Sequence, residues 1–489
     1  RYVPLFASLF IPTSVIAGFV ILLIGPQLLG VWTDSEGVIP GEVLAIWATL
    51  PGLLINVVFA AVMLGKTLPK PTQIWEASAP HVIFGSALSF GQFALGSLAV
   101  VLILTPFFGV TDLAGSIIEL SFAGGHGTIA GMGPLLTEAG ASELIDLGLG
   151  LATISMVTGI VGGSLLVRWA VKNPKIQLAR TVPLTGKEVH DLNNAGVDPT
   201  ERDAEPDNRG MGPVTAAVMC IALAIAIAIG LLEAFRAVFG AFGSDVFDTF
   251  PLFPFTVIGG YLVQQVATWL KQDQFIEKRS VNGISAISLD VLIATAIGTM
   301  SLATLGANIP VLIVFTIIAV LWSVIALLYF GPRIHGRNWF EHAIADFGQS
   351  QGNVATGFVL ADMVDPQRRT NAANAYGYKQ LGYEPFLGGG LITAFSVPLI
   401  IAWGSLTFGL VSLGLAVGFL AWGMWRRRAL DRAAAGLQKA GADHGRHSVY
   451  AVASGRASSG VDSRSVLAEP GNTLPSPQST LSPQAGAWA

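Results

Sequence analysis

The sequence contains few charged residues and only one cysteine. Charged side chains make up 12% of the 489 residues, whereas hydrophobic ones make up 52%. Soluble domains carry about twice that charged share, so the composition indicates an all-α polytopic protein embedded in a lipid bilayer. A net charge of −4 is too small to suggest a nucleic-acid partner. The single Cys220 excludes an intrachain disulfide and any cysteine-based zinc or redox motif, and we expect no cofactor.

Apolar runs long enough to cross a bilayer account for much of the chain. A transmembrane helix needs about 20 largely apolar residues. Ten candidate runs are 5–29, 44–64, 81–105, 145–170, 213–239, 251–270, 284–306, 309–331, 380–402 and 405–425. The chain begins with Arg1 rather than methionine, which indicates a fragment or a processed product. The first run is longer than a signal-peptide core and lacks a cleavage pattern, so we interpret it as a retained span.

Basic residues collect in alternate loops. These loops contain, among others, Lys66, Lys70, Arg168, Lys172, Arg333 and Arg337. The intervening loops 34–42, 109–112 and 243–248 carry acidic residues or no charge. Lysine and arginine are enriched in cytoplasmic loops, so we place the basic side of the protein in the cytoplasm.

Two stretches, 114–142 and 338–366, are too interrupted for ordinary helices and too apolar for ordinary loops. Glycine and proline, which weaken helices, are concentrated at 124–134 in the first stretch. Irregular backbone at membrane depth survives only where it is buried in protein or lines a water-filled cavity. In the predicted topology the first stretch enters from outside and the second from the cytoplasm. We therefore predict two re-entrant hairpins whose tips meet near the midplane.

An internal repeat is visible. Residues 11–19 (IPTSVIAGF) resemble residues 253–261 (FPFTVIGGY), and the predicted topology gives the two helices that begin there opposite directions. This pattern is typical of an inverted-topology repeat. We assign 1–170 to a first repeat that lacks its first helix and 213–402 to a second repeat. The remaining parts are a cytoplasmic linker at 171–212, an additional transmembrane helix at 405–425 and a polar cytoplasmic tail at 429–489 that is predicted to be disordered.

The first hairpin combines glycines with polar side chains. Its candidate substrate-binding and ion-binding residues are Ser121, Gly124, Gly125, His126, Gly127 and Thr128. Carbonyl groups freed by a broken helix, together with the Thr128 hydroxyl, are suitable for binding sodium, and half-helix N-termini attract anionic groups. The alternative is close helix packing, which glycines allow in any membrane bundle. For His126 we expect a structural hydrogen bond or a substrate contact rather than a metal, because the other histidines show no intramembrane ligand spacing.

The second hairpin is rich in amides and hydroxyls. Its candidates are Gln349, Ser350, Gln351, Gly352, Asn353 and Thr356, and Gln92 and Asn56 are further polar candidates in the spans. A polar run at membrane depth is costly without partners, so we expect contact with a polar zwitterion, the alternative being the lining of a water-filled vestibule. Asn353 is a second candidate sodium ligand. We expect no lysine or arginine deep in the membrane, and Glu119 and Asp346 to be helix caps or interfacial charges.

At Gly124-Gly-His-Gly-Thr128 the sequence resembles the bacterial sodium/glutamate symporter family. The resemblance covers roughly residues 11–400 and includes Ile11-Pro12, Ala17-Gly18 and Gln92-Phe-Ala-Leu-Gly96. It implies a bacterial cell-membrane transporter with two inverted repeats, a re-entrant hairpin in each, a homodimeric assembly and an elevator-like movement. The second hairpin departs from the family pattern, because relatives have more glycines and fewer amides there.

These observations together predict a secondary transporter and not an enzyme. We expect symport of glutamate, or of a related small anionic amino acid or carboxylate, with sodium as the coupling ion. The alternative is a channel or an intramembrane enzyme with a polar hairpin site. A channel would have a polar stripe along a continuous pore, and a hydrolase would need a partner for Ser121 and His126 that the sequence does not offer.

Overall fold

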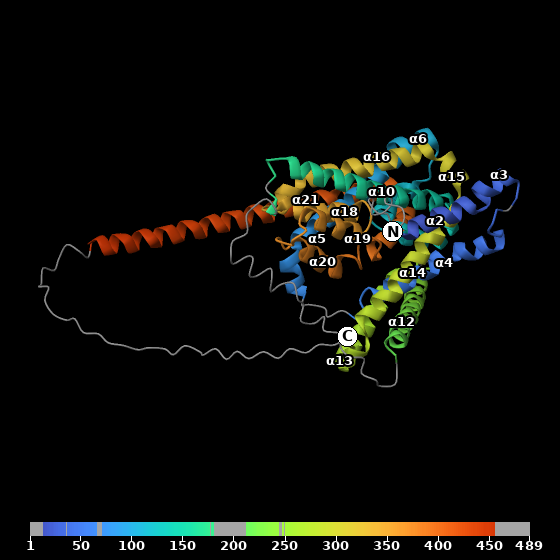
Figure 1. Ribbon diagram of the computed structural model, residues 1–489, viewed down its shortest axis with the longest axis horizontal. Coiled ribbons are helices and arrows are strands. Elements are labelled where there is room, and N and C mark those ends of the chain that lie inside the picture. Colours follow the sequence, from blue (N-terminus) through green and yellow to red (C-terminus); the bar gives the residue numbers. More distant parts are fainter. Residues whose placement is uncertain are drawn as a thin grey trace, which may run out of the picture. The chain divides into compact units, whose positions relative to one another are not determined.

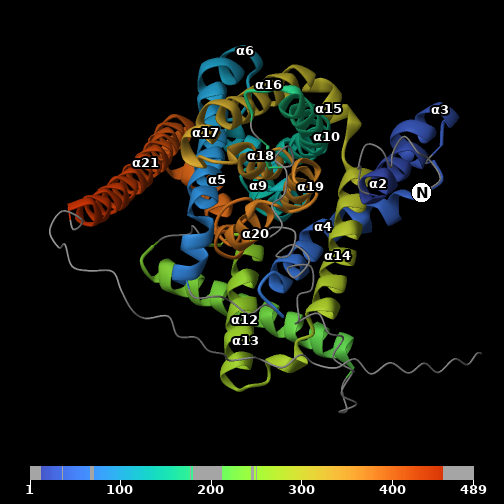
Figure 2. The ribbon, with the colours of Figure 1, turned by 60° about the vertical axis from the view of Figure 1, so that its left-hand side comes forward.

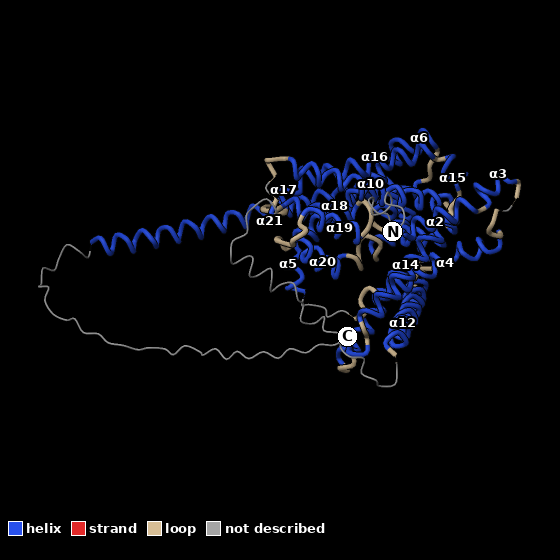
Figure 3. Tube along the Cα trace, viewed as in Figure 1, coloured by secondary structure: helices blue, strands red, loops and turns tan. Residues whose placement is uncertain are grey.

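The computed structural model describes residues 13–35, 37–65, 71–176, 178–179, 212–243, 247–248 and 250–454, and they contain helices without strands (Figure 3). Residues 11–12 of the repeat motif, most of the predicted linker 171–212 and the end of the tail lie outside them. The chain divides into two units, Arg1–Ala429 and Leu430–Ala489. Helix α21 (Leu391–Ser454) extends into the tail for which the sequence predicts disorder.

Eight candidate membrane spans are present in the described part of the chain. They are Thr13–Thr33, Gly41–Ala61, Ser78–Phe108, Glu143–Lys172, Pro213–Ala241, Lys278–Thr299, Ile309–Ile334 and Leu391–Gly436. Their length and apolar composition suit a bilayer, which establishes a multi-pass membrane protein. Ser78–Phe108 is largely buried by its neighbours, whereas most of Pro213–Ala241 is exposed, as expected for a helix that faces lipid.

Two of the ten predicted spans differ from the structure. The run at 251–270 forms α13 (Phe253–Trp269), a helix of 17 residues that is shorter than an ordinary span. The run at 380–402 is not one helix, because α20 (Ala372–Tyr383) ends within it and α21 begins only at Leu391. The predicted extra helix 405–425 belongs to α21 and follows a kink at Gly404.

The helices of the first unit form two groups (Figures 1 and 2). One group consists of α2 (Thr13–Ile24), α4 (Gly41–Ala61), α12 (Pro213–Ala241), α13 and α14 (Lys278–Thr299), which pack on one another. The other consists of α5 (Pro71–Ala99), α10 (Glu143–Lys172), α16 (Ile309–Ile325), α18 (Trp339–Ser350), α19 (Val354–Val364) and α20.

Small side chains bring the helices of the first group close together. Ala60 on α4, Ala224 on α12 and Gly260 on α13 are all buried, and a Cβ atom on Gly260 would collide with the carbonyl oxygen of Ala60. Helix association in a membrane depends on close backbone packing of this kind, because lipid chains are as apolar as the side chains.

The two glycine-rich stretches are interrupted as predicted. The first interrupted segment comprises η3 (Asp112–Ser116), α7 (Ile117–Phe122), α8 (Gly125–Gly131) and α9 (Gly133–Glu138). The second interrupted segment comprises α18 and α19, which pack against each other. A Cβ atom on Gly348 of α18 would lie 2.7 Å from the Cα atom of Gly357 on α19, so these glycines allow the two short helices to touch.

Candidate functional site

The break in the first interrupted segment lies between α7 and α8. Gly124 N donates to the carbonyl of Glu119 at 2.9 Å, and Gly125 then takes a φ angle of 76° at the start of α8. That left-handed conformation is readily available only to glycine, which is why the chain can turn here. One turn later the Thr128 hydroxyl donates to the carbonyl of Gly124 at 2.8 Å and stabilises the backbone at the break.

The break in the second interrupted segment lies at 351–353. The side-chain oxygen of Asn353 accepts hydrogen bonds from Thr356 N at 2.9 Å and from the Thr356 hydroxyl at 3.2 Å. Asn353 is therefore the N-cap of α19 and satisfies a backbone group that the helix leaves free. On the other side of the break, α18 ends at Ser350.

The two breaks adjoin each other and the loop 384–390. A Cβ atom on Gly125 would lie 3.9 Å from the carbonyl oxygen of Gly352. In the loop, a Cβ atom on Gly389 would lie 2.5 Å from Thr128 Oγ1, and one on Gly388 would lie 3.4 Å from Gln349 Nε2. Three irregular stretches, distant in the sequence, thus form one buried centre, which we call the tip site.

Glu119 connects the loop to α7. Its Oε1 atom accepts hydrogen bonds from Gly388 N at 3.1 Å and from the Thr393 hydroxyl at 3.0 Å. The residue is fully buried, and its second oxygen, Oε2, has no hydrogen-bond partner among the described residues. A buried carboxylate oxygen without a donor or a cation is costly, so this atom marks a place for a ligand.

Two further polar atoms near the breaks are buried without partners in the part of the chain that the structure describes. They are Ser121 Oγ on α7 and Gln92 Oε1 on α5. The amide nitrogen of Gln92 donates to the carbonyl of Ser350 at 2.7 Å, which places Gln92 directly against the second break. Each unsatisfied buried group costs about 1–3 kcal/mol, and a bound ion or substrate would remove that cost.

The amides of the second segment are bonded to protein groups. Gln351 Nε2 donates to the carbonyl of Ala319 at 3.0 Å and to Ser323 Oγ at 2.8 Å, both on α16. Gln349 Oε1 accepts from Lys379 Nζ at 2.7 Å and from Gln380 Nε2 at 3.0 Å, both on α20. These amides fix the second break to its neighbours.

A buried ion pair lies next to Gln349. Lys379 Nζ lies 2.9 Å from Asp346 Oδ1, and each residue is only 1% exposed. Lys379, at the edge of the predicted span 380–402, is thus a buried cation paired with a protein carboxylate and not an exposed charge. Asp346 is likewise neither a cap nor an interfacial charge, because its partner lies on α20 inside the protein.

Comparison with known proteins identifies the family. A family profile described as sodium/glutamate symporter matches residues 1–353, which is more than half of the chain. The chain belongs to the sodium/glutamate symporter family. Among curated proteins no match is found. The matched region ends at the second break, earlier than the residue 400 that the sequence resemblance suggests.

Other residues that the sequence predicts for the site lie beside the tip site. His126 Nε2 forms a 2.9 Å hydrogen bond with the hydroxyl of Thr153 on α10, which is the structural bond that the sequence analysis allows for. Gly127 packs against Ile55, so it permits close approach of α4, as in the packing alternative. Asn56 borders a cavity of about 390 Å³ between α4, α9, α12 and α13, and its Oδ1 atom has no hydrogen-bond partner among the residues described.

Sequence reasoning missed Glu119, Lys379 and the loop 384–390 as parts of this centre. Glu119 carried a usable signal, because an acidic residue within a membrane-depth segment is a functional candidate by default. The loop also carried one, since Pro385 and three consecutive glycines at 388–390 are incompatible with the helix predicted at 380–402. The sequence gives no such indication for Lys379, because this residue lies at the edge of a predicted span.

Proposed function

We propose that this protein takes up glutamate, or a related small anionic amino acid or carboxylate, by symport with sodium. The observation that carries the proposal is the tip site, where two interrupted segments and a glycine-rich loop enclose polar atoms without partners. Binding sites of secondary transporters are typically built from interrupted helices of this kind. Family membership supports the reaction class, and the tip site is the location that we propose for it.

We propose the space at Glu119 Oε2 as the sodium site. The free carboxylate oxygen supplies negative charge, and the backbone carbonyls at the first break supply further oxygen ligands. The Thr128 hydroxyl lies at this break, since it bonds to Gly124 and faces Gly389. Asn353 is the other sodium ligand expected from the sequence. Its side-chain oxygen caps α19, so we do not assign Asn353 as a main ligand of the ion.

The substrate would bind beside the ion, between Ser121, Gln92 and the second break. Ser121 Oγ and the Gln92 amide oxygen lack partners and suit the polar groups of an amino acid. Sodium at Glu119 would order the loop that bonds to the same carboxylate, and the substrate would bind this ordered state better. Such a difference in affinity between two states is the source of coupling.

We further propose that 1–170 and 213–402 are inverted repeats and that the two interrupted segments are re-entrant hairpins from opposite faces. Two spans support the repeat. In each, a five-residue π-helix, η2 (Val100–Leu104) or η6 (Ala326–Phe330), precedes a four-residue α-helix. The second residue of the short helix is proline in both, Pro106 and Pro332. Proline lacks the N–H group that would bond to the preceding turn. Both spans therefore change from α-helix to π-helix just before a proline at the equivalent position.

Reciprocal packing also favours the repeat. Helix α4 packs along α14, while α2 packs on α14 and α13 packs on α4, as a twofold relation between the halves would produce. The helix group of α2, α4, α12, α13 and α14 would be the scaffold of an elevator mechanism. The tip site would move with the other group, and we propose a homodimer in the bacterial cell membrane built on the scaffold.

Uptake into proteoliposomes tests the function. A panel of radiolabelled amino acids and carboxylates should show glutamate or a close relative entering when a sodium gradient is imposed. Sodium and proton gradients are applied separately, so that the coupling ion is identified. Turnover of an ester or peptide without dependence on either gradient, or uptake that no sodium gradient accelerates, would contradict the proposal.

Glu119→Gln tests the ion site. The variant keeps the shape and the acceptor for Gly388 but removes the charge, so the sodium concentration for half-maximal uptake should rise at least about tenfold, equivalent to roughly 1.4 kcal/mol. Asp112→Asn is the matched control, because Asp112 is an exposed acid at the start of the same segment. Equal sodium dependence in both variants and the wild type would place the ion elsewhere.

A further inference from the structure

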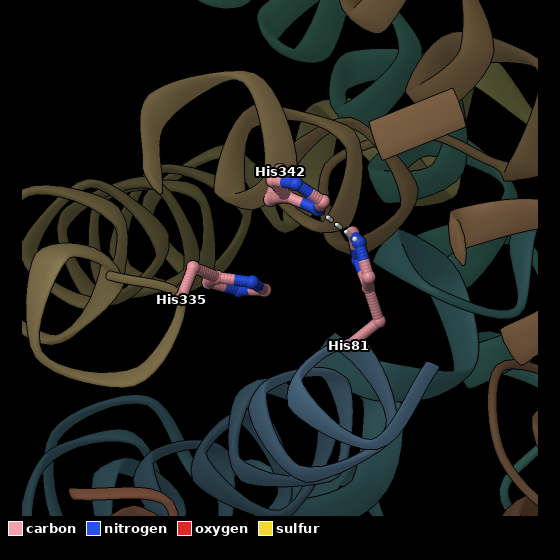
Figure 4. A group of neighbouring side chains, drawn as sticks. All are labelled: His81, His335 and His342. Atoms are coloured by element: carbon pink, nitrogen blue, oxygen red, sulfur yellow. Dashed lines mark hydrogen bonds between the residues drawn. The ribbon is translucent and has the colours of Figure 1, made fainter. Parts of the chain in front are cut away.

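Three histidines gather outside the tip site. His81 lies on α5, His335 follows the short helix α17 (Gly331–Ile334), and His342 lies on α18. One ring nitrogen of each can be chosen so that all lie within 4.8 Å of one another. Figure 4 shows the rings of His81 and His342 joined by a hydrogen bond, with the ring of His335 directed towards them. His81 lies 261 positions before His342, so folding brings together histidines for which the sequence shows no intramembrane ligand spacing.

The hydrogen bonds of His81 orient its ring. Asp346 Oδ2 lies 2.7 Å from His81 Nδ1, and because a carboxylate only accepts, Nδ1 carries the proton. In the neutral ring Nε2 is then the acceptor nitrogen, and it lies 2.9 Å from His342 Nδ1. A histidine that donates one nitrogen to a carboxylate and presents the other is the usual arrangement of a metal ligand with its outer partner.

His335 provides the second, independent observation. Its side chain is only 1% exposed, and neither ring nitrogen has a hydrogen-bond partner among the residues that the structure describes. Buried imidazoles normally find a partner, and an orphaned one needs a physical reason. The Nε2 atom of His335 lies 3.7 Å from Asp346 Oδ2, too far for a hydrogen bond, and a ligand bound between the three rings would supply the direct bond that is missing.

We propose that His81 Nε2, His342 Nδ1 and a ring nitrogen of His335 form a binding site for a divalent transition metal of the zinc class. Imidazole nitrogen suits this class of ion, and three histidines with an open fourth position are a known zinc arrangement. Bonds of about 2.0–2.1 Å require ligand atoms about 3.4 Å apart. His81 Nε2 and His342 Nδ1, now 2.9 Å apart, must therefore move slightly apart, whereas nitrogens near the 4.8 Å limit must move closer. On binding, His342 takes its other neutral tautomer.

The surrounding charges fit this assignment. Lys379 bonds to Oδ1 of Asp346, whereas His81 bonds to Oδ2, so the ammonium group lies on the far side of the carboxylate. Asp346 is thereby held as the outer partner of His81. The three ligands come from α5, α18 and the turn before α18, so a bound metal would tie the second interrupted segment to α5.

Cobalt binding to the purified protein tests the site. The chain is prepared with a tag free of histidine, with Cys220→Ser, His190→Ala, His444→Ala and His447→Ala, and is stripped with a chelator. We expect one Co²⁺ per chain with the visible absorption of a four-coordinate ion, displaced by one equivalent of Zn²⁺. Thermal unfolding should also shift upward with Zn²⁺, because a ligand that binds only the folded state stabilises it.

Variants separate a metal site from a structural cluster. His335→Ala and His342→Ala should each weaken Co²⁺ binding at least tenfold, and His335→Cys should restore binding with a sulfur-to-cobalt charge-transfer band. Size-exclusion profiles show which variants remain folded, and His342, which is only partly buried, is the less disruptive position. Absence of stoichiometric Co²⁺ in the parent protein, or unchanged binding in folded His335→Ala or His342→Ala, overturns the proposal.

Discussion

Lys379 and Asp346 form an ion pair from which solvent is excluded. The two residues lie 33 positions apart, on α20 and α18, and they meet only when these helices pack. Composition and hydrophobic pattern cannot reveal such a pair. In the sequence, Lys379 is an isolated charge beside the predicted span 380–402, and Asp346 is an isolated charge in the stretch 338–366. Asp346 also accepts from His81, so the carboxylate joins three helices.

Removing one member of this pair should destabilise the protein strongly. Lys379→Met leaves a buried carboxylate without its cation, and we expect the free energy of unfolding to fall by about 3–5 kcal/mol. Thermal unfolding in detergent measures the change. Glu233→Gln is the control, because its exposed pair with Arg236 should contribute less than about 1 kcal/mol. Equal stability of the two variants would mean that the Lys379 pair is solvated.

Thr128→Val tests a hydroxyl at the first break. Valine keeps the shape but cannot bond to the carbonyl of Gly124 or bind sodium, so the uptake rate should fall with little loss of folded protein. Thr137→Val removes the same kind of bond, from Thr137 to Gly133 at 2.8 Å, away from the break. We expect normal uptake in that control. Full activity and unchanged sodium dependence in Thr128→Val would remove Thr128 from the ion site.

The interrupted segments and the loop 384–390 differ in how well the sequence predicts them. The segments were predicted, because glycine and proline within apolar runs mark broken helices directly. The apolar pattern places the loop in the first turns of the predicted span 380–402, although its own proline and glycines argue against a helix. The convergence of the three stretches depends on packing between distant residues, such as Gly389 against Thr128, and no local pattern encodes it.

Gly389→Ala tests whether the loop closes the tip site. Gly389 has a φ angle of 109°, and an added Cβ atom would lie 2.5 Å from Thr128 Oγ1. Backbone strain of about 1–2 kcal/mol combines with this clash, so the loop should retract and sodium affinity should fall. Gly109→Ala is the matched control, because Gly109 has a φ angle of 66° with open space around it. Similar sodium affinity in the two variants would show that contact with Thr128 is unimportant.

At the scale of the whole molecule, the apolar runs predicted most of the spans. They did so because a bilayer imposes a minimum length and a low charge on any helix that crosses it. The division into two helix groups could not be predicted in this way. It depends on which apolar faces meet, and large apolar side chains look alike whether they face lipid, as Leu223 does, or a neighbouring helix, as Ile221 does.

The accessibility of two cysteines tests the proposed inverted arrangement. Ala139 follows the first interrupted segment and Gln367 follows the second, and both are exposed, unlike the residues at the breaks. Hairpins from opposite faces place Ala139 outside and Gln367 in the cytoplasm. In a Cys220→Ser background, Ala139→Cys should react in intact cells with a membrane-impermeant maleimide. Gln367→Cys should react only in inside-out vesicles, and transport by both variants verifies the native fold. Labelling of both positions from the same face would rule out inverted hairpins, whatever the substrate proves to be.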